Sequence, residues 1–398
     1  MEASRWGAEE RREIGAARAV VAALPWIVTP VVTAIRVHRS QSLDDESDTP
    51  PENPPKVSVV IPARNEARNI ERCLRSVLSN DYPQFDVVVV DDQSSDGTGD
   101  IARSIAAKDA RARVIETGSP PEGWFGKQWA CQTGASASAG DIILFADADT
   151  VQSSDLITRS VNTIQRRNAD LFSILGRQEL GSFWERVIQP QVFGIMSVRY
   201  GGTESITGSR FVADKIANGQ CLFVRRDTYE QLGGHALVKS HVADDLMMAQ
   251  RYFARGKRVV AAEGLNQLST RMYTSLGELV RGWGKNVFAG GRDAVPFGWF
   301  GRLLFPFLLL SAPMFSLAPA LVLVASLVLS LPSEVVLWAV ITQVALFLWW
   351  GYVYWQIDES ILYALLSPLG ALVIFYIFTR AALRGQRVVW KDRTYISR

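Results

Sequence analysis

Cysteine and net charge are both scarce in this sequence. Its 398 residues contain three cysteines, Cys73, Cys131 and Cys221, and their spacing matches no metal-binding pattern. An odd, scattered set of this kind predicts a reducing compartment, with neither a disulfide framework nor a zinc site. The formal net charge is only +2, and no basic stripe interleaved with aromatic residues crosses the middle of the chain. Nucleic acid is therefore not an expected partner.

Charged side chains are absent from three long stretches near the C-terminus, 303–331, 335–357 and 361–379. About 20 apolar residues cross the hydrocarbon core of a bilayer, so these stretches are long enough to span it. A fourth apolar run, 19–35, is of marginal length. No small-residue cleavage site follows it, whereas basic residues do, so we interpret it as a membrane anchor rather than a cleavable signal peptide.

Basic residues gather beside the apolar runs. Arg36 and Arg39 follow the first run, and six more follow the last: Arg380, Arg384, Arg387, Lys391, Arg393 and Arg398. This distribution suits the anionic headgroups of a cytoplasmic leaflet. We expect an integral protein of the inner, cytoplasmic membrane whose middle domain faces the cytoplasm.

The loop 356–360 carries two acidic residues and no basic one, which favours the outer face of the membrane. The runs on either side of this loop would then form a hairpin with both ends inside. In that arrangement 303–331 must begin and end on the cytoplasmic side, as a re-entrant or interfacial segment. Its three prolines fit such a break, because each removes a helix hydrogen bond. A single tilted crossing by these 29 residues is the alternative.

Residues 40–55, SQSLDDESDTPPENPP, are polar, acidic and rich in proline, and they predict a tether. This linker separates the N-terminal anchor at 1–39 from a folded domain at 56–300. C-terminal membrane segments at 301–380 and a basic tail at 381–398 complete the chain.

Within the domain, apolar strands alternate with stretches typical of helices. The strands are VSVVIP, FDVVVVDD, ARVIET and DIILFADAD, and beyond Asp155 the pattern loosens into mixed elements. Alternation of this kind predicts right-handed βαβ units, and continuous apolar strands predict a parallel sheet covered on both faces. The expected fold class is α/β, a Rossmann-like domain joined to α-helical transmembrane or interfacial segments.

Two carboxylates end the strand DIILFADAD. Because side chains alternate along a strand, Asp147 and Asp149 point the same way. Two anions side by side repel each other unless a divalent cation lies between them, and their hard oxygen ligands suit Mg²⁺ or Mn²⁺. A solvated Asp pair in a turn is the alternative for this tripeptide taken alone.

Polar residues also follow the first two strands: Pro62, Arg64, Asn65 and Glu66 after one, and Asp91 and Asp92 after the other. The carboxyl ends of parallel strands meet at one edge, where open α/β sheets bind their ligands. A carboxylate in this crevice can accept hydrogen bonds from ribose hydroxyls or a base N–H. DDQSSDGT also predicts an Asp-rich turn that caps a helix, and the two interpretations are compatible.

Five segments, in this order and spacing, resemble the family-two glycosyltransferases with the GT-A fold: VSVVIPARNE, DDQSSDGT, DADT, GQCLFVRRDTYEQLGGH and ADDLMMAQ. The resemblance covers 57–291. It implies an inverting transfer of a sugar from a nucleotide-diphosphate sugar, with a UDP-sugar as the expected donor.

The resemblance also implies a role for each segment. Asp149 would bind the metal, with Asp147 bridging to the ribose or to the same cation. Asp245 would be the catalytic base, although Asp244 replaces the family's usual Glu and could exchange roles with Asp245 or cap the following helix. The nucleotide-sugar would contact Pro62, Arg64, Asn65, Glu66, Asp91, Asp92, Lys127 and Asp147.

RMYTSLGELVRGWGKNVFAGG offers Arg281, Trp283 and Lys285 to the diphosphate or the acceptor. The family motif usually ends in Arg-Trp, whereas Gly282 separates the two here. Aromatic residues near a membrane entry are commonly interfacial anchors, and we interpret Trp299 and Phe300, but not Trp283, in that way.

PPEGWFGKQWA together with RMYTSLGELVRGWGKN resembles the membrane-bound branch that glycosylates carotenoids, hopanoids and ceramides. The expected acceptor is therefore a hydroxyl of a membrane lipid, including a glycerolipid. Two alternatives stay open: a polyprenyl-phosphate glycosyltransferase, whose acceptor needs no general base, and a non-catalytic membrane scaffold. Segment 183–200 mixes aromatic, apolar and basic residues and would line an interfacial entry or form ordinary core.

Overall fold

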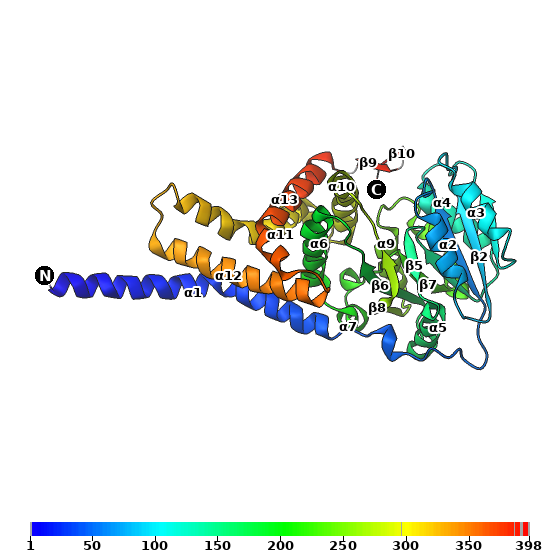
Figure 1. Ribbon diagram of the computed structural model, residues 1–398, viewed down its shortest axis with the longest axis horizontal. Helices are drawn as coiled ribbons and strands as arrows, with labels where there is room; N and C mark the ends of the chain where they lie inside the picture. The colour runs from blue at the N-terminus through cyan, green and yellow to red at the C-terminus, as the bar shows by residue number, and fades with distance from the viewer. Residues whose placement is uncertain (1, 296, 386, 391–392, 397–398) are drawn as a thin grey trace.

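The fold, known from a computed structural model that describes residues 2–295, 297–385, 387–390 and 393–396, has two parts. The sheet domain comprises residues 40–295, and the helical part comprises α1 (Glu2–His38) and residues 297–385. Figure 1 shows α1 and its partner helices extending from one side of the sheet domain.

The sheet domain is built on eight strands. They are β1 (Val57–Ala63), β2 (Phe85–Asp91), β3 (Ala112–Glu116), β4 (Ile142–Ala146), β5 (Thr150–Gln152), β6 (Leu171–Gln178), β7 (Cys221–Arg225) and β8 (Val259–Thr270), in the spatial order β3-β2-β1-β4-β7-β6-β8-β5. The first four form the predicted parallel half. β7 runs antiparallel to β4 and β6, and β5 runs antiparallel to β8, so the other half is mixed.

Helices cover both faces of this sheet. They are α2 (Ile70–Leu78), α3 (Thr98–Ala106), α4 (Gly126–Ser136), α5 (Leu156–Arg167), α7 (Thr203–Gly208), α8 (Arg226–Gln231) and α9 (Asp244–Ala254). Two further helices, α6 (Phe183–Tyr200) and α10 (Leu276–Ala294), pack against the helical part. Val59 of β1 packs in the core under α2 and α5, whereas its neighbour Val60 packs in the core under α4 and α9. Alternate side chains thus enter opposite cores, which is why the strands read as continuous apolar runs. The predicted α/β fold class is confirmed.

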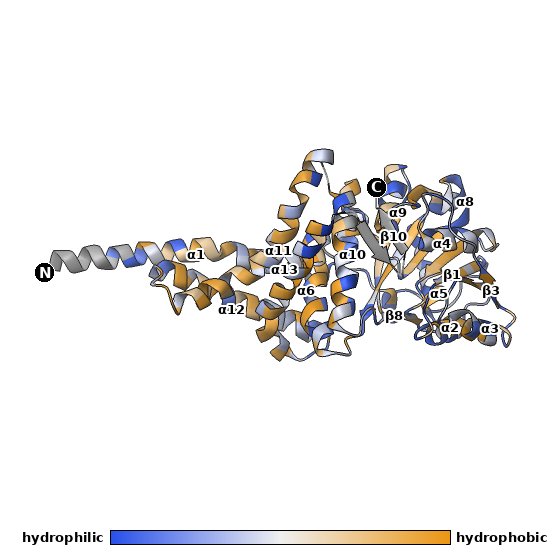
Figure 2. Ribbon diagram, turned by 90° about the horizontal axis from the view of Figure 1, so that it is seen from above, coloured by the Kyte–Doolittle hydropathy of each residue, from blue (hydrophilic) through white to orange (hydrophobic). Residues whose placement is uncertain are grey.

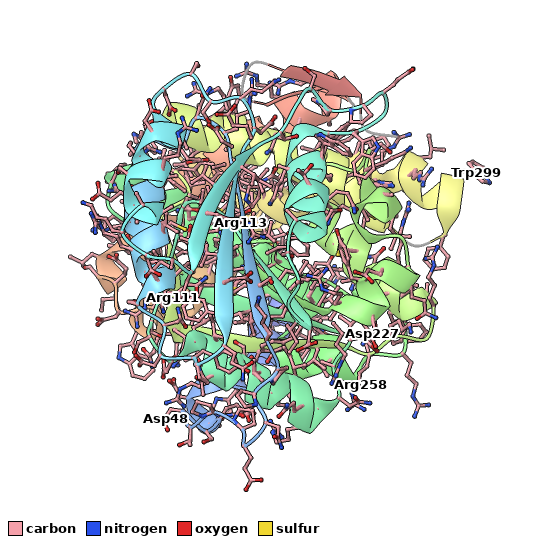
Figure 3. The ribbon with its side chains drawn as sticks, turned by 90° about the vertical axis from the view of Figure 1, so that its right-hand side faces the viewer. Asp48, Arg111, Arg113, Asp227, Arg258 and Trp299 are labelled. Carbon is pink, nitrogen blue, oxygen red and sulfur yellow. The ribbon has the colours of Figure 1, made fainter. Side chains whose placement is uncertain are left out.

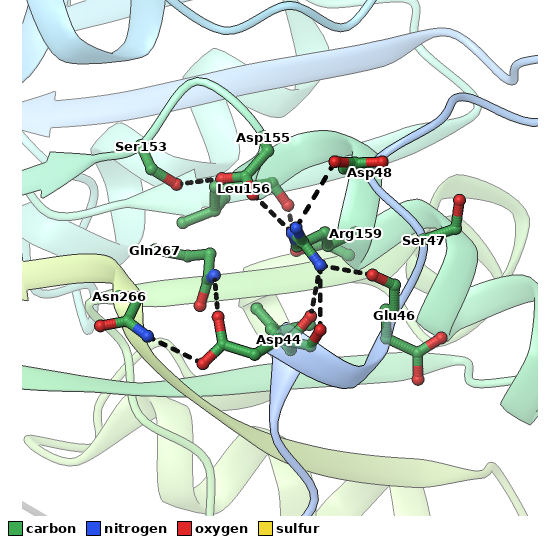
Figure 4. Close-up of polar contacts among 12 residues, drawn as sticks. Asp44, Glu46, Ser47, Asp48, Ser153, Asp155, Leu156, Arg159, Asn266 and Gln267 are labelled. Atoms are coloured by element: carbon green, nitrogen blue, oxygen red, sulfur yellow. Dashed lines mark hydrogen bonds and ion pairs between the residues drawn. The ribbon is translucent and has the colours of Figure 1, made fainter.

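The linker 40–55 is not the free tether that its composition predicts. Leu43, in the short 3₁₀ helix η1 (Leu43–Asp45), is fully buried in the sheet-domain core. Asp44 accepts hydrogen bonds from Asn266 (2.8 Å) and Gln267 (2.7 Å). Arg159 of α5 donates to the main-chain carbonyls of Leu43, Asp44 and Glu46 (Figure 4). One leucine and a set of paired charges therefore fix a segment that is otherwise polar.

The helical part contains α11 (Gly298–Ser326), α12 (Ser333–Gln356), the 3₁₀ helix η4 (Ile361–Leu366) and α13 (Ser367–Arg384). Trp26 of α1 stacks on Phe315 of α11, with ring centroids 4.2 Å apart, and meets Trp338 of α12 edge-on at 5.2 Å. Among the described residues, four helical stretches are long and apolar enough to cross a membrane: Arg12–His38, Gly298–Ser326, Ser333–Gln356 and Ile361–Arg384. Figure 2 shows how hydrophobic residues dominate this part of the molecule.

The structure favours a different pairing of the apolar runs from the hairpin that we expected. The loop after α11 lies at the far end from the sheet domain, and α12 returns toward that domain (Figure 1). There Glu359 pairs with Arg186 of α6 at 3.0 Å, and the Tyr354 hydroxyl donates to the Arg186 carbonyl at 2.7 Å. The hairpin is therefore α11 with α12, and α11 is one helix despite its prolines. The acidic loop is neutralised by Arg186 instead of facing away, and acidic residues carry little weight in the positive-inside bias.

Trp299 and Phe300 lie at the start of α11, where their side chains are 77% and 51% exposed. Trp299 projects from the edge of the molecule in Figure 3, as an interfacial anchor would. Two short antiparallel strands, β9 (Arg387–Trp390) and β10 (Arg393–Ile396), end the described chain. Lys391 and Arg398 of the basic tail lie outside the described residues.

Candidate active site

The carboxyl ends of β1 and β4 open onto one pocket. Asp147 follows β4, and Lys127 lies in the first turn of α4, with its Nζ 2.7 Å from Asp147 Oδ1. The pocket is lined by Pro62, Lys127, Cys131, Phe145, Ala146, Asp147, Gly219, Leu222, His235, Asp244, Asp245 and Met248. The parallel pairing of β1 with β4 therefore brings Pro62 and Asp147 together, as the sequence predicts.

Lys127 is the cation at the centre of this pocket. Burial lowers the pKa of Lys127, but Asp147, Asp244 and Asp245 raise it more, and the result lies well above the ordinary lysine value. The ammonium group is therefore charged at neutral pH. A fixed positive charge here suits a diphosphate.

Asp149 has the features of a metal ligand. Its Oδ1 is buried without a hydrogen-bond partner, although its main-chain carbonyl accepts from Thr270 at 3.2 Å. Burial, then Asp147 and Glu66, raise the pKa of Asp149 to about 7. No group of three or more His, Cys, Asp or Glu side chains within the described ranges is arranged to hold a metal alone. The residues fit a cation that takes one or two carboxylates from the protein and its other ligands from phosphate and water, as Mg²⁺ does.

Asp245 lies in the first turn of α9. Its Oδ2 accepts from the Gly219 N–H and its Oδ1 from the Leu246 N–H, both at 2.7 Å. Burial, and then Asp244, raise the pKa of Asp245 to about 6. Asp244 is 7% exposed and begins the helix, whereas Ala243 occupies the N-cap, so the cap that we considered for Asp244 is absent.

Hydrogen bonds join the loop after β1 to the loop after β2. Arg64 donates to the Asp92 carbonyl at 2.6 Å, and Asn65 Oδ1 accepts from the Ser95 N–H at 2.9 Å. Asn65 has the left-handed φ of 51° that allows this turn. Asp91 Oδ1 accepts from the Ser94 N–H at 3.0 Å. These contacts confirm the Asp-rich turn, while nucleotide binding by its residues stays a prediction.

Glu66 and Asp92 lie at this edge beside the pocket. The Glu66 N–H donates to Thr98 at 2.7 Å, and Glu66 Oε2 accepts from Asn69 at 2.9 Å. Glu66 is close enough to raise the pKa of Asp149. Asp92 is 2% exposed, and its N–H donates to the Ala63 carbonyl at 2.8 Å. The three strand ends that the sequence predicts therefore form one edge.

The α10 residues are placed differently from the other candidates. Trp283 is buried in an apolar cluster, with its ring 5.6 Å from Phe193 of α6 and 6.0 Å from Tyr273. A Cβ on Gly282 would lie 2.2 Å from the Tyr273 ring, which explains why glycine separates Arg281 from Trp283. Arg281 is exposed, and neither it nor Lys285 lines the pocket.

Sequence reasoning missed Tyr273 and His235. Burial, and then Asp149, raise the pKa of Tyr273, so this side chain lies between Asp149 and Trp283. His235 lines the pocket with Nδ1 2.8 Å from the Tyr229 hydroxyl, and burial lowers its pKa to about 3. A lone tyrosine or histidine has no spacing pattern, so only the fold reveals either one.

The sequence of the sheet domain is similar to those of known glycosyltransferases. Residues 58–233 match the family model described as Glycosyl transferase family 2. The 4,4'-diaponeurosporenoate glycosyltransferases of Staphylococcus haemolyticus (strain JCSC1435) and Staphylococcus aureus (strain USA300) are each 28% identical over 244 residues. These matches cover 60% of this chain and 63% of each relative, so the chain spans less than two thirds of their length.

A solved structure with a similar fold is a mannosyltransferase. A mannosyltransferase from Pyrobaculum calidifontis, in complex with GDP-Man and Mn²⁺, is 21% identical, with a TM-score of 0.54 over 90% of this chain and 98% of that one. Residues 58–233 are therefore similar to glycosyl transferase family 2, and the sheet domain has the GT-A-like fold of this structural neighbour.

Proposed function

We propose that the protein transfers a sugar from a nucleotide-diphosphate sugar to a hydroxyl of a membrane lipid, with inversion and with Mg²⁺ or Mn²⁺. One observation carries this proposal. Asp245, a carboxylate with a raised pKa, and Lys127, a cation paired with Asp147, line the same pocket at the carboxyl edge of the sheet.

Asp245 is suited to take a proton from the acceptor. A general base works best when its pKa lies near the operating pH, and a positioned carboxylate contributes about 10²–10⁴-fold to the rate. The Gly219 and Leu246 N–H groups fix its orientation. As the proton passes to Asp245, the acceptor oxygen bonds to the anomeric carbon on the face opposite the departing diphosphate, and the configuration inverts.

Lys127, Asp147 and Asp149 face the leaving group. Asp149 and Asp147 would hold the cation, which when bound stabilises the negative charge that develops on the diphosphate. Lys127 donates hydrogen bonds to phosphoryl oxygens. The Tyr273 ring meets Trp283 edge-on and limits water at this side of the site. The Pyrobaculum protein of the same fold was solved with GDP-Man and Mn²⁺, which agrees with this class of donor.

The packing of the helical part beside the pocket supports a lipid acceptor. Gly290 of α10 lies so close to Ala243 that a Cβ there would be 2.8 Å from the alanine methyl, one residue before Asp244. α10 in turn packs on α11 and α13, so the proposed base is one helix away from the membrane-type helices. The Staphylococcus relatives are named for a carotenoid acid, and we assign this chain a carotenoid, hopanoid, ceramide or glycerolipid acceptor at the cytoplasmic face of the inner membrane.

A lipid comparison tests the proposal. Cells that express the wild-type chain should accumulate a lipid heavier by one sugar residue, whereas cells that express Asp245→Asn should not, as measured by mass spectrometry of untargeted extracts. Asp227→Asn, an exposed acid on α8, is the matched control and should accumulate the same lipid as wild type. Identical extracts from wild-type and empty cells, despite stable protein, would favour a non-catalytic scaffold.

A further inference from the structure

An apolar tip projects from the sheet domain between α7 and β7. Phe211 is 72% exposed and Val212, the first residue of the 3₁₀ helix η2 (Val212–Asp214), is 40% exposed, with exposed Arg210 beside them. Large apolar side chains on the tip of a polar loop are costly in water, so a contiguous pair of them indicates a contact surface.

The tip is held rigidly. Asp214 accepts from Arg199 of α6 at 2.8 Å and from Ser209 at 2.7 Å, which closes the loop at its base. Arg199 also donates to the Ala213 carbonyl at 2.9 Å. Lys215 is 1% exposed and donates to the Ile206 and Thr207 carbonyls, each at 2.8 Å. The exposure of Phe211 is therefore fixed by the fold and does not result from a loose loop.

The tip continues a surface that already faces lipid. Val31, Val32 and Ile35 are about half exposed on the apolar part of α1. Directly after them, Arg36 donates to the carbonyl of Val198, which is itself 42% exposed at the end of α6. The next residue of α6 is Arg199, which clamps the tip, and Figure 1 shows α7 beside the end of α1. Exposed apolar side chains thus occur on α1, at Val198 and at the tip, and the contacts of Arg36 and Arg199 connect these three places.

We propose that the tip at residues 210–212 inserts into the interfacial layer of the bilayer as a second anchor beside α1. Phenylalanine and valine enter the boundary between headgroups and acyl chains, and Arg210 remains among the headgroups. This inference depends on the proposed membrane association of the chain and is independent of glycosyl transfer. From the tip the chain passes through buried Lys215 to Gly219, whose N–H orients Asp245, so the anchor would also set the height of the base above the membrane.

The test uses the full-length protein in lipid nanodiscs. A single cysteine placed by Phe211→Cys carries an environment-sensitive NBD label, because the three native cysteines are buried. Lipids with a nitroxide at a shallow acyl position should quench this label by about twofold or more, since interfacial residues lie roughly 5–10 Å deep. Val212→Cys reports on the same tip if the first variant fails to fold.

Ser104→Cys is the matched control. Ser104 is exposed on α3, at the end of the sheet domain opposite α1 in Figure 1, and its label should be unaffected by nitroxide lipid. Solvent-like, unquenched emission at both tip positions would show that the tip lies in water and would overturn the proposal. Blue-shifted emission without nitroxide quenching would also overturn it, because a protein surface would then cover the tip. No donor or acceptor is needed, so a failure here leaves the proposed transfer reaction intact.

Discussion

Asp245 combines burial, two main-chain hydrogen bonds and a neighbouring acid. Asp245→Asn keeps the size and most of the bonding but cannot take a proton. We expect kcat to fall by about 10²–10⁴-fold while donor affinity, measured by calorimetry, is unchanged. If the variant stays substantially active, the acceptor already carries a negative charge, as a polyprenyl phosphate does.

The pH profile depends on the same carboxylate. Because burial and Asp244 raise the pKa of Asp245 to about 6, the carboxylate is protonated and inactive as a base below that pH. The initial rate should fall about tenfold for each pH unit below 6 and level off above it. Rates between pH 4.5 and 8, with stability checked at each pH, measure this, and a flat profile from pH 5 to 7 would argue against Asp245 as the base.

Asp149 should cost stability when no cation is bound. Its pKa rises from 3.8 to about 7 on folding, so the ionised form is disfavoured in the folded state, and the cost appears above pH 4 and is complete above pH 7. At pH 8 in EDTA, Asp149→Asn should raise Tm by about 2–4 °C, equivalent to roughly 1 kcal/mol. Adding Mn²⁺ with nucleotide should then raise the Tm of wild type but not of the variant. Equal shifts in both proteins would remove Asp149 from the metal site.

At the residue level, the sequence predicts the members of recurring motifs better than isolated residues. Asp147 and Lys127 occur in segments with a recognisable order, and they meet at 2.7 Å. Arg281 belongs to a motif interrupted by Gly282, and it lies on the surface instead. His235 and Tyr273 have pKa values shifted by burial and by neighbouring side chains, and only long-range packing creates these surroundings.

The linker at 40–55 shows, at the scale of elements, that long-range contacts cannot be predicted from composition. Its composition predicts a tether, yet Arg159 gathers three of its carbonyls and Leu43 fills the core. Arg159→Ala should lower the stability of the sheet domain by about 1–3 kcal/mol, because the carbonyls lose a charged donor. Chemical denaturation measures this, and limited proteolysis within 46–55 should become faster.

Arg258→Ala serves as the control for that measurement. Arg258 is exposed at the surface in Figure 3, and its removal should change stability by less than about 0.5 kcal/mol. If the two variants unfold alike, the docked linker contributes nothing to the stability of the sheet domain.

The order of the membrane-type helices leads to a labelling prediction. Val328, in the loop after α11, is 86% exposed at the end of α11 that points away from the sheet domain, whereas Asp358 follows α12 on the side of the sheet domain. Cysteines at these two positions should react with an impermeant reagent from opposite sides of the membrane, Val328→Cys in intact cells and Asp358→Cys only after permeabilisation. Labelling of Asp358→Cys but not of Val328→Cys in intact cells would restore the hairpin of the last two runs.

Hydropathy identifies the apolar helices but not how they pair. The four candidate spans match the four apolar runs, because length and composition are properties of the sequence alone. The return of α12 to the sheet domain is fixed by the ion pair between Arg186 and Glu359, which are 173 residues apart. The parallel half of the sheet could be predicted because the alternation of strands and helices is a local pattern in the sequence. The ion pair could not be predicted, because a contact between distant segments leaves no local pattern.

In the whole molecule, α10 connects the pocket at the sheet edge to the helical part. This helix touches Ala243 beside the two pocket acids and packs on α11 and α13, so one rigid element couples the site to the helical part. The apolar tip at 210–212 would add a second contact on another side. In the proposed function, such a frame would hold the active site over a bilayer, where a lipid hydroxyl could reach it without leaving the membrane.

One measurement tests the central claim directly. The purified full-length chain, in nanodiscs that contain total bacterial lipid, is incubated with Mn²⁺ and a radiolabelled UDP-sugar or GDP-sugar, and the organic phase is counted. We expect label in the lipid fraction with wild type and Asp227→Asn, about 10²–10⁴-fold less with Asp245→Asn, and none in excess EDTA. Label that stays entirely aqueous with every donor, or equal transfer by wild type and Asp245→Asn in EDTA, would contradict a metal-dependent lipid glycosyltransferase.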